Sequence, residues 1–61
     1  MKAMYRFATG RVKVRDIPDD PPPAVIHVRL TDPAGHGRDV DLHRTADWYN
    51  GALVYREEGT P

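Results

Sequence analysis

The sequence predicts a mainly β protein, either a small antiparallel sheet or a partly open five-stranded barrel, in a single domain over residues 1–61. Three observations predict this class. Apolar and polar residues alternate with the period of two that strands require in the segments 2–8, 11–17, 24–31 and 38–43. Clusters of Gly, Pro, Asn and Asp, the residues typical of turns, separate these segments. A chain of 61 residues is also long enough for only one domain.

The first two segments are predicted to form a hairpin around Thr9-Gly10, because a two-residue connection that contains glycine favours a tight turn. In that register Phe7 lies opposite Val12, and the apolar face of the hairpin also includes Val14. The other face carries Met4 and every basic residue of the hairpin: Lys2, Arg6, Arg11, Lys13 and Arg15.

The middle of the chain is predicted to be a stiff connection followed by a second pair of strands. Residues 18–23 include three consecutive prolines, which cannot donate hydrogen bonds to a sheet, so this segment is either a surface connection or a small docking motif. Residues 24–31 and 38–43 are predicted strands on either side of a turn over 32–37. Alternation places their larger aliphatic side chains in the core: Ile26, Val28, Leu30, Val40 and Leu42.

Residues 45–57 allow two interpretations. Thr45 is a suitable N-cap for a short helix, whereas Asn50-Gly51 is the strongest short signal for a hairpin turn. The hairpin interpretation predicts two pairs of opposite residues, Trp48 with Leu53 and Ala46 with Tyr55. Residues 58–61 are expected to form a frayed tail.

The composition narrows the possible classes of protein. The chain has no cysteine, which excludes disulfides, thiolate metal sites and thiol catalysis. It has no apolar run as long as a membrane span and no signal peptide after Met1-Lys2, so we expect a cytoplasmic protein with no membrane partner. Small domains usually need a disulfide, a metal or a partner for stability, and we therefore expect a protein partner or a homodimer.

The sequence offers little for catalysis or for metal binding. It contains no serine, no nucleophile elbow and no glycine-rich phosphate loop, so we expect no enzyme, no catalytic residue and no cofactor. The histidines and two nearby aspartates match no tight metal motif, and we expect no metal site: His27, His36, His43, Asp39 and Asp41.

The charges are strongly segregated along the chain although the formal net charge is zero. Residues 1–15 contain five basic residues and no acidic one, while residues 16–61 contain four basic and nine acidic residues. The basic stretch is either a site for phosphate or a solvated face balanced by carboxylates from the rest of the domain. The sequence pI near 6.8 is lower than that of most nucleic-acid-binding domains.

Several short motifs follow one another in a fixed order: Tyr5-Arg6, Val12 and Val14, Asp16 to Asp19, Val28-Arg29, Asp32 to Gly35, and Ala46-Asp47-Trp48. This order resembles the family of small actinobacterial regulatory proteins that includes BldB. The resemblance implies a non-enzymatic, self-associating partner of helix-turn-helix transcription regulators, with no catalytic residue. It also implies that the last motif begins a helix.

Together these features predict a non-enzymatic interaction module that regulates by docking on another protein, such as a transcription regulator, and that self-associates. The aromatic residues of the last segment are the predicted contacts with the partner: Trp48, Tyr49 and Tyr55. The alternative is a small β-barrel that binds nucleic acid through the basic residues of the first hairpin: Lys2, Arg6, Arg11, Lys13 and Arg15.

Overall fold

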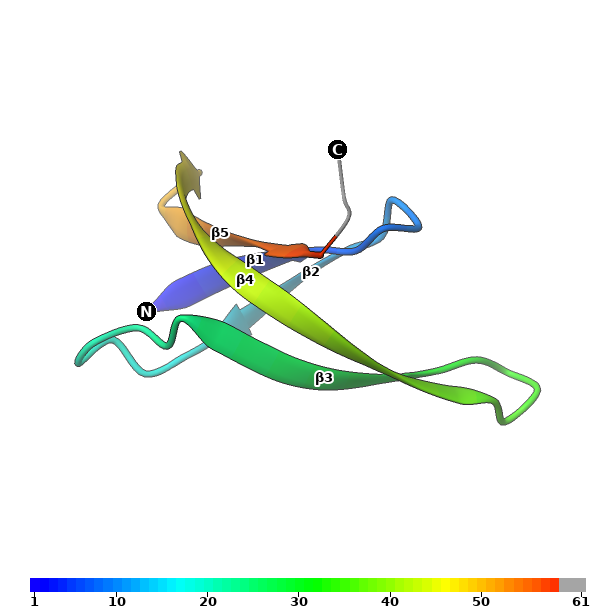
Figure 1. The fold of residues 1–61 in the computed structure, drawn as a ribbon. Helices are drawn as coiled ribbons and strands as arrows, with labels where there is room; N and C mark the ends of the chain where they lie inside the picture. Colours follow the sequence, from blue (N-terminus) through cyan, green and yellow to red (C-terminus); the bar gives the residue numbers. More distant parts are fainter. Residues whose placement is uncertain (59–61) are drawn as a thin grey trace.

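The computed structural model describes residues 1–58, which form one curled sheet of five strands (Figure 1). The strands are β1 (Lys2–Arg6), β2 (Val12–Asp16), β3 (Val25–Thr31), β4 (Gly37–Tyr49) and β5 (Ala52–Glu57). They lie in the order β2-β1-β5-β4-β3, and the sheet curls into a half-barrel with β2 and β3 at its two edges. The predicted all-β, partly open five-stranded architecture is therefore confirmed. The sheet is mixed, because β1 and β5 run parallel and the other neighbours run antiparallel.

The β1–β2 hairpin has a different register from the predicted one. The amide of Phe7 donates to the carbonyl of Arg11 at 2.9 Å, and the amide of Gly10 donates to the carbonyl of Phe7 at 3.0 Å. The loop therefore has three residues rather than two, with Gly10 in the left-handed region at a φ of 91°. A change of one residue in register turns every side chain of a strand to the opposite face.

This register changes which residues of the hairpin share a face. Tyr5 lies opposite Lys13, and Met4 lies opposite Val14. Val12 and Val14 are therefore outside the core, each 50% exposed, and their predicted place in the core is wrong. The prediction that all five basic residues share one face is also wrong. By their pairing, Arg11, Lys13 and Arg15 lie on the core side of β2, whereas Lys2 and Arg6 lie on the outer side of β1.

The core fills the inner side of the curled sheet. The ring of Tyr5 meets those of Tyr55 and Phe7 edge to face, with centroids 6.1 and 6.5 Å apart. Aliphatic side chains from β3 and β4 complete the core as predicted, with Val40 and Leu42 buried. Three partly buried residues of β3 pack against it: Ile26, Val28 and Leu30.

The proline-rich segment 18–23 links β2 to β3 and therefore connects the two edges of the sheet. Two side chains of the sheet hold it in place. The hydroxyl of Tyr55 donates to the carbonyl of Pro23 at 2.5 Å, and the guanidinium of Arg44 donates to the carbonyl of Pro22 at 2.6 Å. Because Pro22 and Pro23 have no amide hydrogen, their carbonyls are the backbone groups through which they can bond to the sheet.

Residues 45–57 form a strand, a turn and a strand, so the helical alternative and the helix implied by the resemblance are both wrong. Asn50 and Gly51 both have positive φ angles, 48° and 80°, as a type I′ hairpin turn requires. Trp48 lies opposite Leu53 as predicted. The predicted partner of Tyr55 is wrong, because an irregularity between Arg44 and Trp48 places Arg44 there.

The hydroxyl of Thr45 fills this irregularity in β4. It donates to the carbonyl of Val54 at 2.7 Å and accepts from the amide of Asp47 at 3.1 Å. The Thr45 hydroxyl thus takes the place of a backbone amide as the donor to the Val54 carbonyl, where the register of β4 shifts. The predicted frayed tail, 58–61, lies outside the described residues except for Glu58, which is in a turn.

Candidate functional site

The outer face of the sheet carries an apolar patch over β1, β2, β5 and the end of β4. Three buried side chains form its centre and make a cluster separate from the core: Met4, Ala52 and Val54. Around them lie three exposed apolar or aromatic residues, Val12 and Val14 at 50% and Tyr49 at 60%. We call these six residues the outer patch. Sequence reasoning missed Val12 and Val14, because the predicted register placed them in the core.

A groove of about 390 Å³ crosses the outer patch and is lined by Met4, Arg6, Val12 and Tyr49. Tyr49 reaches it from the end of the β4–β5 hairpin, since it lies opposite the small side chain of Ala52. A shallow groove with one aromatic wall and one guanidinium suits the docking of an apolar side chain from a protein partner.

The structure separates the three predicted contact residues. Trp48 is 59% exposed and, as the residue opposite Leu53, lies on the other face from Tyr49. Tyr55 is fully buried, and its ring packs in the core. The prediction that Tyr55 contacts a partner is therefore wrong. Its alternation with Leu53 along β5, both facing the core, is the signal that could have placed it there.

Three cations stand in a row along the edge strand β2 and its preceding residue: Arg11, Lys13 and Arg15. We call them the basic ridge. Among residues 1–58 none of the three forms an ion pair with a carboxylate. Burial raises the pKa of the Tyr5 phenol above its ordinary value of 10.0, and the Arg15 guanidinium partly opposes this shift. Arg15 pairs with the core residue Ala3, so it lies on the same inner side of the sheet as Tyr5.

The carboxylates of the other strands are paired with basic side chains of their own half of the chain. Across β3 and β4, Asp41 meets His27 at 2.5 Å and Asp39 meets Arg29 at 3.2 Å. Asp47 meets Arg56 at 3.0 Å. In the part of the chain that the structure describes, no such pair reaches the basic ridge, so its positive charge is not balanced by a direct contact.

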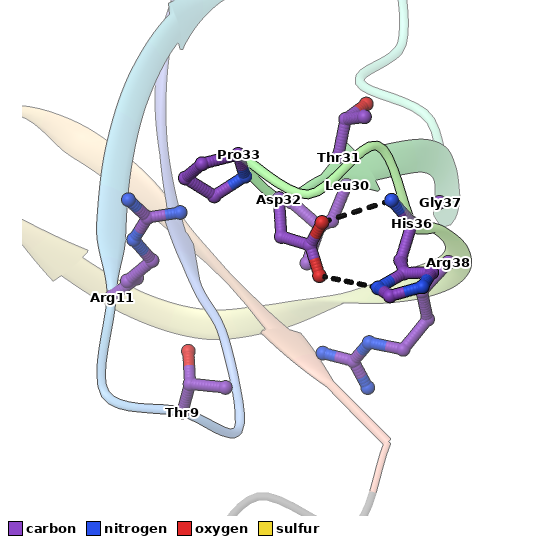
Figure 2. A pocket seen from close by; sticks show the side chains of 9 residues that line it. All are labelled: Thr9, Arg11, Leu30, Thr31, Asp32, Pro33, His36, Gly37 and Arg38. Atoms are coloured by element: carbon purple, nitrogen blue, oxygen red, sulfur yellow. Dashed lines mark hydrogen bonds and ion pairs between the residues drawn. The ribbon is translucent and has the colours of Figure 1, made fainter.

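A second cavity, of about 470 Å³, opens between the loop of the β1–β2 hairpin and the turn of the β3–β4 hairpin (Figure 2). We call it the mouth cavity. Arg11 reaches into it from one side, and Leu30 and Pro33 give it an apolar part on the other. Polar groups complete the lining: Thr9, Thr31, Asp32, His36 and Arg38, together with Gly37.

Glu57 joins the two sides of the mouth cavity. Its side chain is 10% exposed. One carboxylate oxygen accepts from the amide of Ala8 at 2.7 Å, and the other accepts from the guanidinium of Arg38 at 2.9 Å. A buried carboxylate with charge-assisted bonds to both hairpins fixes the distance between them. Sequence reasoning placed no role on Glu57, and alternation along β5 was the available signal for its burial.

Two tyrosines of the core have shifted ionisation. Burial raises the pKa of the Tyr55 phenol above 10.0, the Arg44 guanidinium lowers it in part, and Tyr5 raises it further. The shift of the Tyr5 pKa has the same leading cause. Both phenols are therefore neutral at physiological pH, where they act as packing and hydrogen-bonding groups rather than as bases.

The histidines lie apart, each beside a different carboxylate. His27 pairs with Asp41, His36 with Asp32, and His43 lies 3.9 Å from Glu58. Among residues 1–58 no group of three or more potential ligands is placed to hold a metal ion. The same residues contain no helix that is long and apolar enough to cross a membrane.

The outer patch, the basic ridge and the mouth cavity are thus the surfaces on which a function can be argued. The chain matches no protein-family model, no curated protein and no solved structure. The geometry of these surfaces is therefore the basis for the function proposed below.

Proposed function

We propose that this protein is a non-enzymatic interaction module that self-associates and docks on a regulatory protein partner through the outer patch. The observation that carries the proposal is the arrangement of Val12, Val14 and Tyr49, all at least half exposed, around the buried cluster of Met4, Ala52 and Val54. A transcription regulator as the partner follows from the resemblance to the BldB family alone.

The outer patch has the properties of an interface because the sheet is apolar on both faces at its centre. Sheets of soluble domains bury an apolar face against a second layer. Among the described residues the inner face has such cover from the curled sheet and the connection 18–23, but no segment lies across the outer patch. Contiguous exposed apolar patches mark interaction sites in soluble proteins.

The composition of the outer patch also fits a contact with protein. Tyrosine and tryptophan are enriched among the residues that carry binding energy. Tyr49 is 60% exposed at the wall of the groove, and Arg6 beside it offers a bidentate donor at the rim. Trp48 is exposed on the opposite face of the same hairpin end. A partner that binds both faces of this end would contact Trp48 as well as Tyr49.

Sedimentation equilibrium over a range of protein concentrations tests the proposal. We expect the wild type to self-associate and Val14→Asp to be monomeric, because a buried carboxylate at the interface has no partner. Val25→Asp is the matched control, since Val25 is 37% exposed on β3, outside the outer patch. A wild type that stays monomeric, or a Val25→Asp variant that dissociates as fully as Val14→Asp, would contradict the proposal.

A further inference from the structure

We propose that the basic ridge and the mouth cavity together bind single-stranded nucleic acid, with phosphates along the ridge and one base in the cavity. This inference goes beyond the interaction module, because it uses the inner side of β2 and the loop beside it rather than the outer patch. Two observations carry it. Among residues 1–58 the cations of the ridge have no carboxylate partner, and a partly apolar cavity shares Arg11 with the ridge.

The basic ridge matches a polyanion in its geometry. Side chains that alternate along a strand lie about 7 Å apart on one face, which is close to the spacing of successive phosphates in an extended strand of nucleic acid. Arg11 and Arg15 are exposed and Lys13 is half-buried, so all three can be reached from solvent. The ridge belongs to an edge strand, whose only neighbour among the described strands is β1.

The mouth cavity continues the row at Arg11 and provides a place for a base. Its volume of about 470 Å³ is within the range of small-ligand sites. Leu30 and Pro33 offer apolar surface to the face of a base, and the hydroxyl of Thr9 can bond to its edge. Figure 2 shows Arg11 pointing toward Pro33 across the cavity, so a guanidinium lies beside the apolar part.

Among the described residues, the one carboxylate that lines the cavity already has partners within its own turn. One oxygen of Asp32 accepts from the amide of His36 at 2.9 Å, and the other lies 3.3 Å from the ring of His36. A second cation, Arg38, lines the same cavity and is 51% exposed while it pairs with Glu57. Residues 1–15, which include the basic ridge, contain five basic residues and no acidic one, although the formal net charge of the whole chain is zero.

The shape of the site selects a single strand over a duplex. A base can enter a cavity between two loops only when it is unstacked and unpaired, as in single-stranded segments. Three phosphate contacts on one short strand also form a smaller footprint than the groove surfaces of a duplex. An acidic peptide would match the ridge but would leave the cavity without a planar occupant.

Fluorescence anisotropy with a labelled oligothymidylate, measured over a range of salt concentrations, tests the ridge. Three phosphate contacts predict a slope of about −2 for log K against log salt, and Lys13→Gln or Arg15→Gln should each reduce that slope by about 0.7. The controls are Lys2→Gln and Arg6→Gln, which remove the same charge from the outer side of β1. Equal losses in the ridge and control variants would overturn the proposed site.

The cavity is tested with an abasic strand of the same length and with a DNA duplex. We expect both to bind more weakly than the oligothymidylate, and we expect the amides of Thr9 and His36 to shift only when bases are present. Equal binding of the abasic strand, of the duplex or of polyglutamate would overturn the assignment to single-stranded nucleic acid. The result is independent of self-association, because Val14→Asp should bind the oligothymidylate like the wild type.

Discussion

The two hairpins at the edges of the sheet differ in whether their charged side chains form ion pairs. In the β3–β4 hairpin the charged residues of the outer face meet opposite charges across the strands, as Arg29 meets Asp39. In the β1–β2 hairpin the charged residues are almost all basic, and among residues 1–58 they form no ion pair. The difference indicates that the charges of the first hairpin are available for a ligand, whereas those of the second support the sheet itself.

The largest expected effect contrasts one apolar residue from each hairpin. Leu42 of β4 is fully buried, so Leu42→Ala should lower the free energy of unfolding by about 2–5 kcal/mol. Val14 of β2 is 50% exposed, so Val14→Ala should change it by less than about 0.5 kcal/mol in the monomer. Urea unfolding at low protein concentration measures both. Equal losses in the two variants would mean that Val14 is in the core and that the register of the first hairpin is the one predicted from the sequence.

An intermediate effect is expected at the residue that joins the two hairpins. Glu57→Ala removes the acceptor of the Ala8 amide and of the Arg38 guanidinium, which should lower the free energy of unfolding by about 2 kcal/mol. Arg38→Gln should have a smaller effect. The Arg38 side chain is half exposed, so water can take the place of its guanidinium beside the Glu57 carboxylate. Hydrogen exchange of the Ala8 amide gives a second measure, which reports on its bond to Glu57.

The exchange of the Ala8 amide should become faster in Glu57→Ala and stay slow in Arg38→Gln. If the Ala8 amide kept its protection in Glu57→Ala, the link between the hairpins would not depend on this carboxylate.

The smallest effects concern the exposed charges themselves. Asp39→Asn breaks an exposed pair with Arg29 and should lower the free energy of unfolding by less than about 0.5 kcal/mol. Lys13→Gln should raise it slightly, because it relieves repulsion from Arg11 and Arg15 on the same face. Thermal unfolding in low and in high salt measures both, and both differences should disappear in high salt. Destabilisation by Lys13→Gln would show that the basic ridge has partners in the folded chain.

The second hairpin could be predicted from the sequence because only one arrangement buries its aliphatic residues. Ile26, Val28, Val40 and Leu42 alternate with polar residues, so a slip of one residue would expose them all. The all-β class and the turn at Asn50-Gly51 followed from equally local signals. Trp48 and Tyr49, two of the predicted contact residues, are both exposed.

The register of the first hairpin was not predictable from alternation alone, because valine and basic residues alternate in β2 and either face could be the apolar one. One signal favoured the observed register. The predicted register sets Arg6 opposite Lys13, and like charges directly opposite each other destabilise a strand pair. The observed register replaces this with Arg6 opposite Val12 and Lys13 opposite Tyr5.

Contacts between distant parts of the chain account for what was missed. The parallel pairing of β1 with β5 and the irregularity at Thr45 have no local signature, since each depends on a partner strand that only the folded sheet provides. The mouth cavity likewise needs two loops that lie more than 20 residues apart in the sequence, around Thr9 and Pro33. Alternation predicts faces of strands, but it does not predict which faces meet.

The strand order has a consequence for how the chain acquires its fold. β5 is the last of the described strands in chain order, yet it occupies the middle position of the sheet. Before β5 is synthesised, β1 to β4 can form only two separate hairpins, because the strand that pairs with both β1 and β4 is still missing. The arrival of Ala52–Glu57 closes the gap and converts both hairpins into one cooperative unit. A chain shortened before Ala52 would therefore lose its central strand and with it the strand pairing that joins its two halves.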